Sequence, residues 1–494
     1  MEDVCLLLEG TYPYVSGGVS SWVYDLIKRM EDVTFSIVYL GAHRPGSKKM
    51  QYELPGNVVD FRELYLFDYR VDAEPGKKKN SKEHRVIENF LLKMKKGDHA
   101  LFEELLNVAG LDRKRISLYD LVHSKEAWEG LLRMYESESE EHSFLDFFWT
   151  WRFVYLPFFS LLRLSLPMAR VYHSVSTGYA GVLGSMAKIM YKRPFILTEH
   201  GIYTRERKID ISQAEWIYSE TEMEIKVVEG TDFFKDWWKT LFSSFSLLAY
   251  DTADKIITLY EGNRKVQIEE GANPEITSII PNGIDVDLFA SLKKSADEKV
   301  HNIGFVGRVV PIKDIKTLLI AFKIIYEEKK NVHFWMIGPI DEDKDYVKEC
   351  NLLIEMESLQ DVVTFTGKVD VKEYYPKIDV LVLTSVSEGQ PIVLLEAGAC
   401  GIPAVATDVG SCSEILYGMS PEDQLLGPSG VITPIRNSKA TAQAVLRILE
   451  DRSLYKKMSD TARKRIAEYY QIHNLIAGYK LIYNEFMEKI VWPE

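Results

Sequence analysis

The chain has 494 residues, more than one hydrophobic core usually organises, so two or three domains are expected. Hydrophobic residues make up 46% and charged residues 27%, which excludes a fibrous repeat or an extensively disordered chain. With 73 acidic and 60 basic residues the formal charge is -13, which disfavours nonspecific binding to nucleic acid or to an anionic membrane. Catalysis or binding in solution is expected, without a nucleic-acid partner.

Cysteine usage and the first residues bear on the cellular compartment. The chain contains 4 cysteines, widely spaced and without a CxxC pair, so the sequence predicts neither a structural zinc site nor a disulfide framework. The start, MEDVCLLLEG, has two acids and a short apolar run, unlike a signal peptide. A reducing cytoplasm is the expected location.

Apolar runs of strand length recur through the first half of the chain, and several are followed by helical patterns. This succession predicts a parallel α/β sheet. The runs are 4–10, 35–41, 169–175, 194–200 and 255–260.

A helical insertion is expected at about 75–165, within the first domain. Its aromatic end, 144–168, contains three charged residues and so is not expected to span a membrane, while Pro157 and Pro167 are expected to break the helix. Buried helix packing is the favoured interpretation of these aromatic residues and of those in 231–250. The alternative is a docking surface for a partner or a membrane edge.

A second series of strand and helix patterns follows in the second half of the chain. We predict two Rossmann-like domains, 1–290 and 291–476, with a C-terminal helix at about 477–494 that packs back on the first. The ligand is expected between the domains, at the carboxyl ends of the strands. The second series of strands is 301–308, 332–338, 362–367, 379–385 and 403–408.

Two glutamates, Glu388 and Glu396, lie eight positions apart across a predicted strand-to-helix junction. Pro391 is expected at the first helical position, which leaves Glu388 in the loop and Glu396 on the helix. Two carboxylates can accept hydrogen bonds from hydroxyls, and free N–H groups at a helix start favour phosphate. The pattern indicates a sugar nucleotide. The alternative is an ordinary strand-loop-helix unit with solvated glutamates.

Glycines and cations in two other loops fit the same ligand. Gly17 and Gly18 lie between the first strand and the first helix, where backbone amides could approach a diphosphate closely. Arg308 and Lys313 flank a short loop before a helix and could neutralise a leaving phosphate. A plain turn and ordinary surface charges are the respective alternatives.

Two further loops complete the predicted site. His200 ends a strand, where its imidazole could bond a sugar hydroxyl or the reacting centre, although a lone histidine there can also be structural. The loop containing Gly367, Lys368 and Val369 could contact the nucleotide base through its backbone. Backbone contacts leave the identity of the base open.

In this order, the glycine loop, TEH, PNGID, GRVVPIK and EGQPIVLLE closely resemble the retaining GT-B glycosyltransferases of family four. The resemblance covers both domains and implies two Rossmann-like domains facing across a cleft, with 1–290 on the acceptor side and 291–476 binding the nucleotide sugar. It implies that Glu396 binds the ribose hydroxyls and that Glu388 approaches the donor sugar. His200 matches the first-domain histidine that lies beside the donor sugar in that family.

The resemblance also assigns the donor diphosphate and shows one departure. It implies that Arg308 and Lys313 hold the diphosphate, with Gly17 and Gly18 completing that grip. Many family members read EGFG where this chain has EGQP at 388–391. The amide contacts to sugar hydroxyls could therefore be rearranged. The family's donor loop corresponds here to Gly389, Gln390, Pro391 and Ile392.

The resemblance implies retaining transfer of a hexose from a UDP-sugar, with UDP-glucose favoured, to a growing exopolysaccharide or a related saccharide acceptor. No cofactor is expected. No Asp-x-Asp motif stands in the expected place, so we expect metal-independent transfer. The helical insertion could dock to membrane-embedded partners of polysaccharide synthesis. A 2-epimerase or a glycoside phosphorylase could use a similar cleft, and a nucleotide-sensing or scaffold subunit without catalysis is a third alternative.

Overall fold

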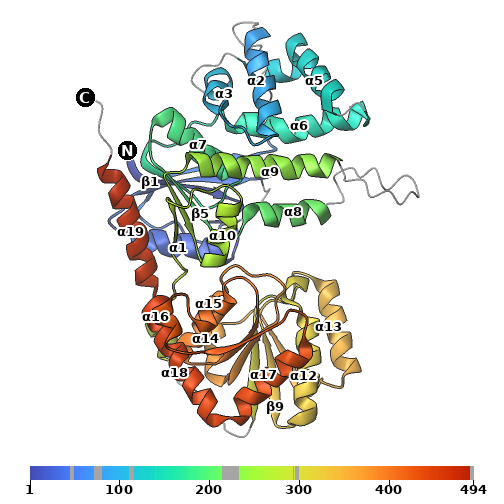
Figure 1. Ribbon diagram of the computed structural model, residues 1–494, viewed down its shortest axis with the longest axis vertical. Coiled ribbons are helices and arrows are strands. Elements are labelled where there is room, and N and C mark those ends of the chain that lie inside the picture. The colour runs from blue at the N-terminus through green and yellow to red at the C-terminus, as the bar shows by residue number, and fades with distance from the viewer. Residues whose placement is uncertain are drawn as a thin grey trace. The chain divides into compact units, whose positions relative to one another are not determined.

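The computed structural model describes residues 1–44, 49–69, 71, 81–110, 116–138, 141–213, 233–292, 294 and 300–489. The chain divides into two compact units, each an α/β domain with its own sheet (Figure 1). Unit 1 comprises Met1–Thr258, Arg264–Ser278 and the chain from Lys480 onward, and unit 2 comprises Leu259–Asn263 and Ile279–Tyr479.

The boundary in the structure differs from 290/291. Residues 279–290, which the sequence analysis places in the first domain, belong to unit 2. The reason is packing, because Val286 and Phe289 of the short helix α11 (Val286–Ala290) are buried in the core of unit 2.

Unit 1 is built on a sheet of seven strands in the order β3-β2-β1-β4-β5-β6-β7, parallel in every pairing from β3 to β6. All five expected runs form strands, and β3 and β7 are additional. Continuous apolar runs reveal the central strands because helices cover both of their faces. The strands are β1 (Glu2–Glu9), β2 (Phe35–Gly41), β3 (Val58–Tyr65), β4 (Ala169–Ser174), β5 (Phe195–Glu199), β6 (Lys255–Thr258) and β7 (Thr277–Ile279). The helices beside them are α1 (Gly18–Arg29), α7 (Tyr179–Tyr191), α8 (Tyr203–Gln213), α9 (Phe233–Thr252) and α10 (Glu261–Glu269).

The expected insertion is helical where the structure describes it, and its first residues, 75–80, lie outside that part. Pro157 does not break the last helix, which continues to Leu161. The interior of this helix is buried, and its packing holds it together across the missing N–H. Among the described residues, no helix combines the length and the hydropathy that a bilayer crossing requires. The helices are α2 (Ser81–Met94), α3 (Phe102–Ala109), α4 (Leu118–His123), α5 (Lys125–Glu138) and α6 (Phe144–Leu161).

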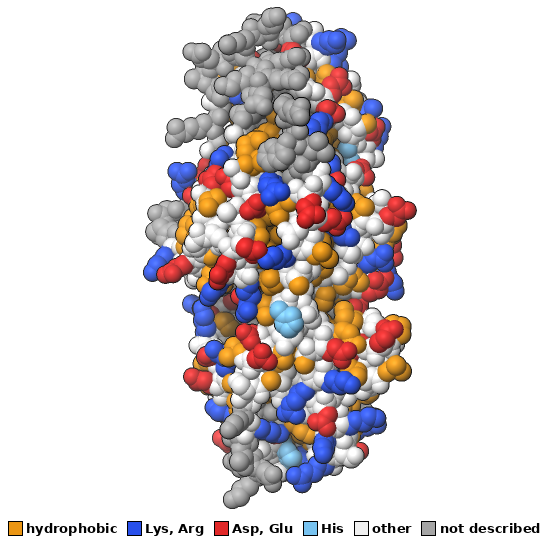
Figure 2. Space-filling view, turned by 90° about the vertical axis from the view of Figure 1, so that its left-hand side faces the viewer, with side chains coloured by type: hydrophobic (Ala, Val, Ile, Leu, Met, Phe, Trp, Pro, Cys, Tyr) orange, Lys and Arg blue, Asp and Glu red, His pale blue; other side chains and the backbone are white. Residues whose placement is uncertain are grey.

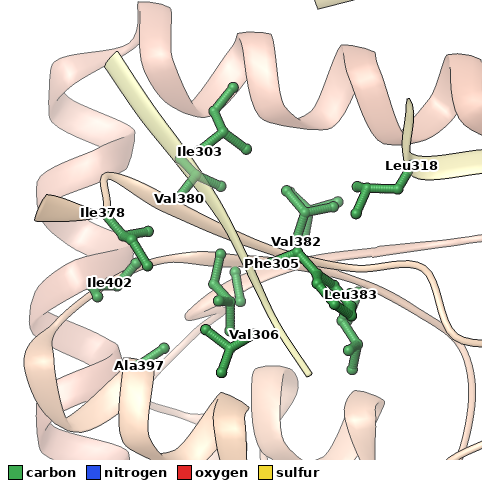
Figure 3. Close-up of a cluster of buried hydrophobic side chains, with 14 of the residues drawn as sticks. Ile303, Phe305, Val306, Leu318, Ile378, Val380, Val382, Leu383, Ala397 and Ile402 are labelled. Carbon is green, nitrogen blue, oxygen red and sulfur yellow. The ribbon is translucent and has the colours of Figure 1, made fainter. Parts of the chain in front are cut away.

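Unit 2 is built on a six-stranded parallel sheet in the order β10-β9-β8-β11-β12-β13. Figure 3 shows its core, in which side chains of β8 and β11 meet Leu318 of α12 and Ala397 of α14. The five predicted strands are present, and β13 is additional. The strands are β8 (His301–Val306), β9 (Val332–Ile337), β10 (Val363–Gly367), β11 (Val380–Leu383), β12 (Ala404–Thr407) and β13 (Gly430–Thr433). The longer helices are α12 (Ile315–Glu328), α13 (Lys344–Met356), α14 (Ile392–Cys400), α17 (Ser438–Glu450) and α18 (Arg452–Tyr469), and the short ones are α15 (Cys412–Tyr417) and α16 (Pro421–Gln424).

The last helix, α19 (Ile472–Glu488), begins in unit 2 and ends in unit 1. In its second half the Tyr483 hydroxyl lies 2.6 Å from Nδ1 of the buried His173, and the Met487 carbonyl accepts a hydrogen bond from Arg170 at 3.0 Å. Lys480 pairs with Asp32 at 2.5 Å. These contacts hold the end of the helix on the first sheet.

The surface carries mixed charge. Figure 2 shows acidic and basic side chains interspersed over one face, with hydrophobic atoms between them. On the insertion, Leu145, Trp149 and Phe153 of α6 are exposed, whereas Phe147 and Trp151 are buried. Buried packing therefore accounts for part of this aromatic helix, and one face of it is open.

Candidate functional site

The site in unit 2 centres on Glu388, in the loop between β11 and α14. Its Oε1 lies 2.6 Å from Nζ of Lys313 and accepts a hydrogen bond from the Ser385 hydroxyl at 2.5 Å. The Lys313 and Glu388 side chains retain only 18% and 11% of their exposure. A largely buried pair with a supporting hydroxyl is held in one geometry, and removal of either partner leaves a charge without compensation.

Lys313 is held in place by the loop after β11. The Thr384 hydroxyl lies 3.1 Å from the carbonyl oxygens of both Lys313 and Asp314. The Val386 N–H donates to the Ile312 carbonyl at 2.9 Å. The loops that follow β8 and β11 are thereby fixed to each other, which places the predicted cation and the predicted carboxylate side by side.

Arg308 lies apart from this pair. Its guanidinium contacts Glu342 at 2.6 Å, and both side chains are about half exposed. An exposed ion pair contributes little to stability and breaks readily when a stronger partner arrives. The structure therefore brings together Lys313 and Glu388 but not Arg308.

Glu396 lies on α14, as expected, and accepts a hydrogen bond from the hydroxyl of the buried Tyr375 at 2.6 Å. Burial raises the pKa of Glu396 to about 7, and the Tyr375 hydrogen bond opposes that rise. Pro391 was expected at the first helical position but occupies the N-cap, because its ψ of 106° is extended and the helix begins at Ile392. No side chain caps this helix start.

The residues that depart from the family pattern take part in packing. Gln390 is 8% exposed, and its Oε1 accepts a hydrogen bond from the Asn282 N–H at 2.6 Å. The Gly389 carbonyl accepts from the Ser411 N–H at 2.9 Å. The Gln390 oxygen therefore binds the loop to the PNGID segment.

The predicted base-binding loop follows β10. Gly367 has φ +67° and forms an isolated bridge with Gly338, so the turn favours glycine there. Lys368 is exposed, and Val369 packs against the core of unit 2. Among the described residues of both units, no group of three His, Cys, Asp or Glu side chains is placed to hold a metal ion.

The predicted diphosphate loop in unit 1 is open. Gly17 is the N-cap of α1 and Gly18 its first residue; both are exposed, and no side chain caps the helix. The Gly17 φ of 169° is extended, and a Cβ there would meet nothing within 4 Å. The fold does not require glycine at position 17. The absence of a side chain there leaves open space in front of the first N–H groups of α1.

His200 follows β5, as expected, and packs edge-on against the Trp22 ring with the centroids 4.7 Å apart. Burial lowers the pKa of His200 to about 4, so the imidazole is neutral near pH 7. Within the described part of the chain its Nε2 has no hydrogen-bond partner. His200 lines a cavity of about 580 Å³ in unit 1.

The cavity extends from the ends of β1, β4 and β5 to helix α8. One face of α8 lines it, with residues at positions 203, 206, 207, 210 and 211, which is the spacing of one helical face. Sequence reasoning stopped at His200 and missed this helix. The signal was present in TEHGIYTRERKID, where Glu206 and Asp210 are four residues apart. Side chains of the cavity that the sequence analysis did not name include Glu9, Thr11, Ser176, Tyr179, Glu206, Arg207, Asp210 and Trp238.

The buried Glu199 contacts Tyr203, one of the residues that line this cavity. It accepts hydrogen bonds from the Tyr250 hydroxyl at 2.7 Å, from the Gln267 amide at 2.8 Å and from the Tyr203 N–H at 3.4 Å. Burial raises the pKa of Glu199 to about 7, and these hydrogen bonds oppose the rise. Since Tyr203 is the first residue of α8, Glu199 fixes where that helix starts.

Known structures share this architecture. HepE of Anabaena, solved with UDP and glucose, aligns over 99% of this chain and 100% of its own with a TM-score of 0.59 at 15% identity. A sucrose-phosphate synthase of Thermosynechococcus elongatus aligns over 99% of this chain and 100% of its own with a TM-score of 0.58 at 15% identity. At such low identity these likenesses show the fold, the GT-B arrangement of two Rossmann-like domains.

Sequence comparisons add the activity. The capsular polysaccharide biosynthesis glycosyltransferase CapM of Staphylococcus aureus is 24% identical over 352 residues, 67% of this chain and 83% of CapM. An N-acetyl-alpha-D-glucosaminyl L-malate synthase of Bacillus anthracis is 24% identical over 275 residues, 47% of this chain and 68% of that protein. Residues 289–465 match the family model described as glycosyl transferases group 1. The protein is a glycosyltransferase with the GT-B fold.

The first half of the chain identifies a narrower family. Residues 2–275, more than half of the protein, match the model described as a domain of unknown function, DUF3492. The chain belongs to this family. The match covers strands β1 to β6 of the first sheet, the helical insertion and the residues that line the cavity beside His200.

Proposed function

We propose that the protein transfers a hexose from a UDP-sugar, with UDP-glucose favoured, to a growing exopolysaccharide, with retention at the anomeric carbon. The observation that carries the proposal is the pairing of Lys313 with Glu388 at the carboxyl end of β11, with Glu396 on the following helix. A cation from the loop after β8 and two carboxylates from the β11–α14 junction fit the diphosphate, the sugar and the ribose of one ligand. HepE, which shares the fold, was solved with UDP and glucose.

The narrower resemblance supports the exopolysaccharide acceptor. EGQP at 388–391, TEHGIYTRER at 198–207 and the helical insertion are similar to the cytoplasmic glycosyltransferase of the bacterial Pel exopolysaccharide system. The named relative CapM acts in capsular polysaccharide biosynthesis. Docking to membrane-embedded partners through the insertion stays a prediction, and a cytoplasmic location fits the free cysteines.

In the proposed reaction an acceptor hydroxyl attacks the anomeric carbon from the face that the diphosphate leaves. The new C–O bond forms as the bond to the β-phosphate oxygen breaks, UDP departs with the bonding electrons, and the hydroxyl proton passes to the departing phosphate. No enzymic nucleophile takes part. Charge accumulates on the leaving oxygen, so a fixed cation such as Lys313 stabilises the transition state more than the ground state.

Arg308 would join Lys313 only when the donor is present. Its contact with Glu342 is exposed, and a bidentate guanidinium-phosphate interaction is stronger than an exposed ion pair. With two cations on the diphosphate and no metal ligand assigned, we propose transfer without a divalent metal. Full activity in a chelating buffer supports this proposal, and loss of activity that Mg²⁺ or Mn²⁺ restores contradicts it.

The donor is tested by thermal shift with UDP-glucose, UDP-galactose and the two UDP-N-acetylhexosamines. A donor that binds only the folded state at 100 times its Kd stabilises it by about 2.7 kcal/mol. We expect the largest shift with UDP-glucose, and no shift with any UDP-sugar removes the donor assignment.

The anomeric configuration of the product, read by NMR, tests retention. Sugar transfer that requires an acceptor separates this activity from that of a 2-epimerase, and any turnover excludes a silent scaffold.

A further inference from the structure

The cavity in unit 1 contains several buried polar atoms without a partner among the described residues. Tyr179 is 3% exposed, and its hydroxyl forms no hydrogen bond there. The same holds for the Thr11 and Ser176 hydroxyls and for His200 Nε2, and all four residues line the cavity. Buried polar groups are normally hydrogen-bonded, so four of them at one cavity indicate a ligand with many hydroxyl groups.

Carboxylates outnumber cations at this cavity. Glu9 is engaged, because it accepts the Tyr203 hydroxyl at 2.7 Å and the Ala180 N–H at 3.3 Å. Asp210 pairs with Arg207 at 3.3 Å. Glu206 lines the cavity, and the part of the chain that the structure describes shows no hydrogen bond or ion pair for it.

The backbone makes room for these acids. A Cβ on Gly201 would overlap the Glu206 carboxylate, and a Cβ on Gly178 would overlap the Tyr203 hydroxyl and the Glu9 carboxylate. Glycine shortly after β5 and at the N-cap of α7 therefore lets acidic groups lie directly against the main chain. Because His200 is neutral near pH 7, it does not offset their charge.

We propose that this cavity selects an acceptor saccharide unit without negative charge, and that Glu206 and Asp210 determine this selectivity. The proposal rests on the proposed function and assigns the acceptor to unit 1, because the residues proposed for the donor lie mainly in unit 2. An ionised carboxylate only accepts hydrogen bonds, which the hydroxyl groups of a sugar can donate and the ionised phosphate or carboxylate group of a charged sugar cannot. A second negative charge in a partly desolvated cavity is repelled, because like charges interact more strongly there than in water.

Aromatic side chains complete a saccharide site. Rings of Tyr203, Trp238 and Phe242 line the cavity together with the polar groups. Such rings offer a large apolar face to the C–H groups of a sugar, while the hydroxyls of the sugar reach the polar atoms. The reacting unit is therefore a neutral sugar, which either a free polysaccharide end or a lipid-linked glycan can supply.

The test uses two probes that differ at one carbon, p-nitrophenyl β-glucoside and p-nitrophenyl β-glucuronide. Their Kd values are measured by NMR titration on the full chain with UDP present. We expect the wild type to bind the glucoside at least about tenfold more tightly than the glucuronide. In the double variant Glu206→Gln with Asp210→Asn the ratio should fall to within about threefold.

A matched control removes two negative charges elsewhere on unit 1. Glu31 and Glu269 are exposed and lie outside the cavity, so Glu31→Gln with Glu269→Gln should keep the wild-type ratio. Melting temperatures establish that both double variants fold. Equal or tighter binding of the glucuronide by the wild type, an unchanged ratio in the cavity variant, or binding of neither probe overturns the proposal.

The source of the saccharide is read in a transfer assay with the donor found by thermal shift. A neutral tetrasaccharide and a prenyl-diphosphate-linked sugar with the same terminal unit are offered separately. Extension of either supports the proposal and names the source, whereas extension of a uronate-terminated analogue in preference to both overturns it. Failure of every UDP-sugar to bind would remove the proposed function, yet the glycoside ratio would still report on the cavity.

Discussion

The two units differ in whether the polar side chains beyond the carboxyl ends of their strands have partners. In unit 2 the Lys313 ammonium forms an ion pair with Glu388, and Glu396 on α14 accepts a hydrogen bond from the Tyr375 hydroxyl. In unit 1 the cavity beside His200 keeps polar atoms without partners in the described chain. Paired groups are held in position and exchange partners when a ligand arrives, whereas unpaired groups lower the stability of the free protein and await a ligand.

The largest effect is expected from breaking the pair in unit 2. Lys313→Ala removes the cation that we assign to the leaving phosphate, so kcat should fall by about 10²- to 10³-fold in a transfer assay. It also leaves the largely buried Glu388 without its partner, so the melting temperature should fall. Lys316→Ala, which breaks an exposed pair with Glu349, is the control and should change neither. Unchanged turnover in Lys313→Ala would exclude this lysine from the mechanism.

Arg308→Ala sharpens the same comparison. Because Arg308 is paired at the surface, its removal should leave the melting temperature unchanged and lower turnover by at least about tenfold. A drop in stability without a drop in turnover would reverse the roles that we assign to the two cations.

Protonation of Glu199 tests the support behind the cavity. Its pKa is about 7 in the folded protein against 4.5 as the ordinary value. Between these pH values the folded state binds a proton that the unfolded state lacks, so this group's stabilisation is complete below pH 4.5 and is lost as pH rises toward 7. Glu199→Gln removes this dependence. As pH rises through this window, the free energy of unfolding of the variant should therefore increase relative to that of the wild type by about 1.4 kcal/mol per pH unit.

Urea unfolding at several pH values across this window provides the measurement. Tyr250→Phe adds a second reading, because it removes a hydrogen bond that lowers the pKa of Glu199 and should move the window to higher pH. A constant difference between Glu199→Gln and the wild type at every pH would show that Glu199 is ionised throughout.

A smaller effect is expected from Gln390. Gln390→Ala deprives the buried Asn282 N–H of its acceptor, which should lower the free energy of unfolding by about 1–3 kcal/mol. The donor KM should rise as the loop loosens. Gln360→Ala, at an exposed position, serves as the control in the same denaturant titration. A rise in KM without any loss of stability would mean that Gln390 contacts the sugar directly.

The smallest effect is expected from Gly201→Ala. The added methyl meets the mobile end of the Glu206 side chain, so the fold should persist while that carboxylate moves. The KM for a neutral acceptor should rise by less than about tenfold at unchanged donor KM. Gly56→Ala adds the same methyl in open space and should behave as the wild type. A large loss of stability in Gly201→Ala would show that Glu206 cannot move aside.

The strands could be predicted where helices cover both faces of the sheet. β1, β2, β4, β5 and β8 read as continuous apolar runs for this reason. β3 has the sequence VVDFRELY, whose charged positions are partly exposed at the sheet edge, and β13 is only four residues long with a glycine. Neither gives a clear periodic signal. The path of α6 through Pro157 depends on tertiary packing, which local sequence does not encode.

For the site, spacing predicted that Lys313 and Glu388 serve one ligand, because each follows a central strand of the same sheet. Spacing could not show that Arg308 turns to Glu342 or that Gln390 accepts the Asn282 N–H, since both contacts join distant segments. The cavity face of α8 was readable in principle. Glu206 and Asp210 follow His200 at helical spacing, but nothing local tells a lined cavity from a solvated helix.

Helix α8 is fixed to the fold by hydrogen bonds at its first residues, and another set of its residues lines the cavity. Glu199 holds its first N–H, and Thr204 bonds to Glu270, while Glu206 and Asp210 point to the cavity. Substitutions on the cavity side leave the attachment intact. Under the proposed function, the choice of acceptor can therefore change through substitutions on one helical face, while the first sheet and unit 2 keep their structure.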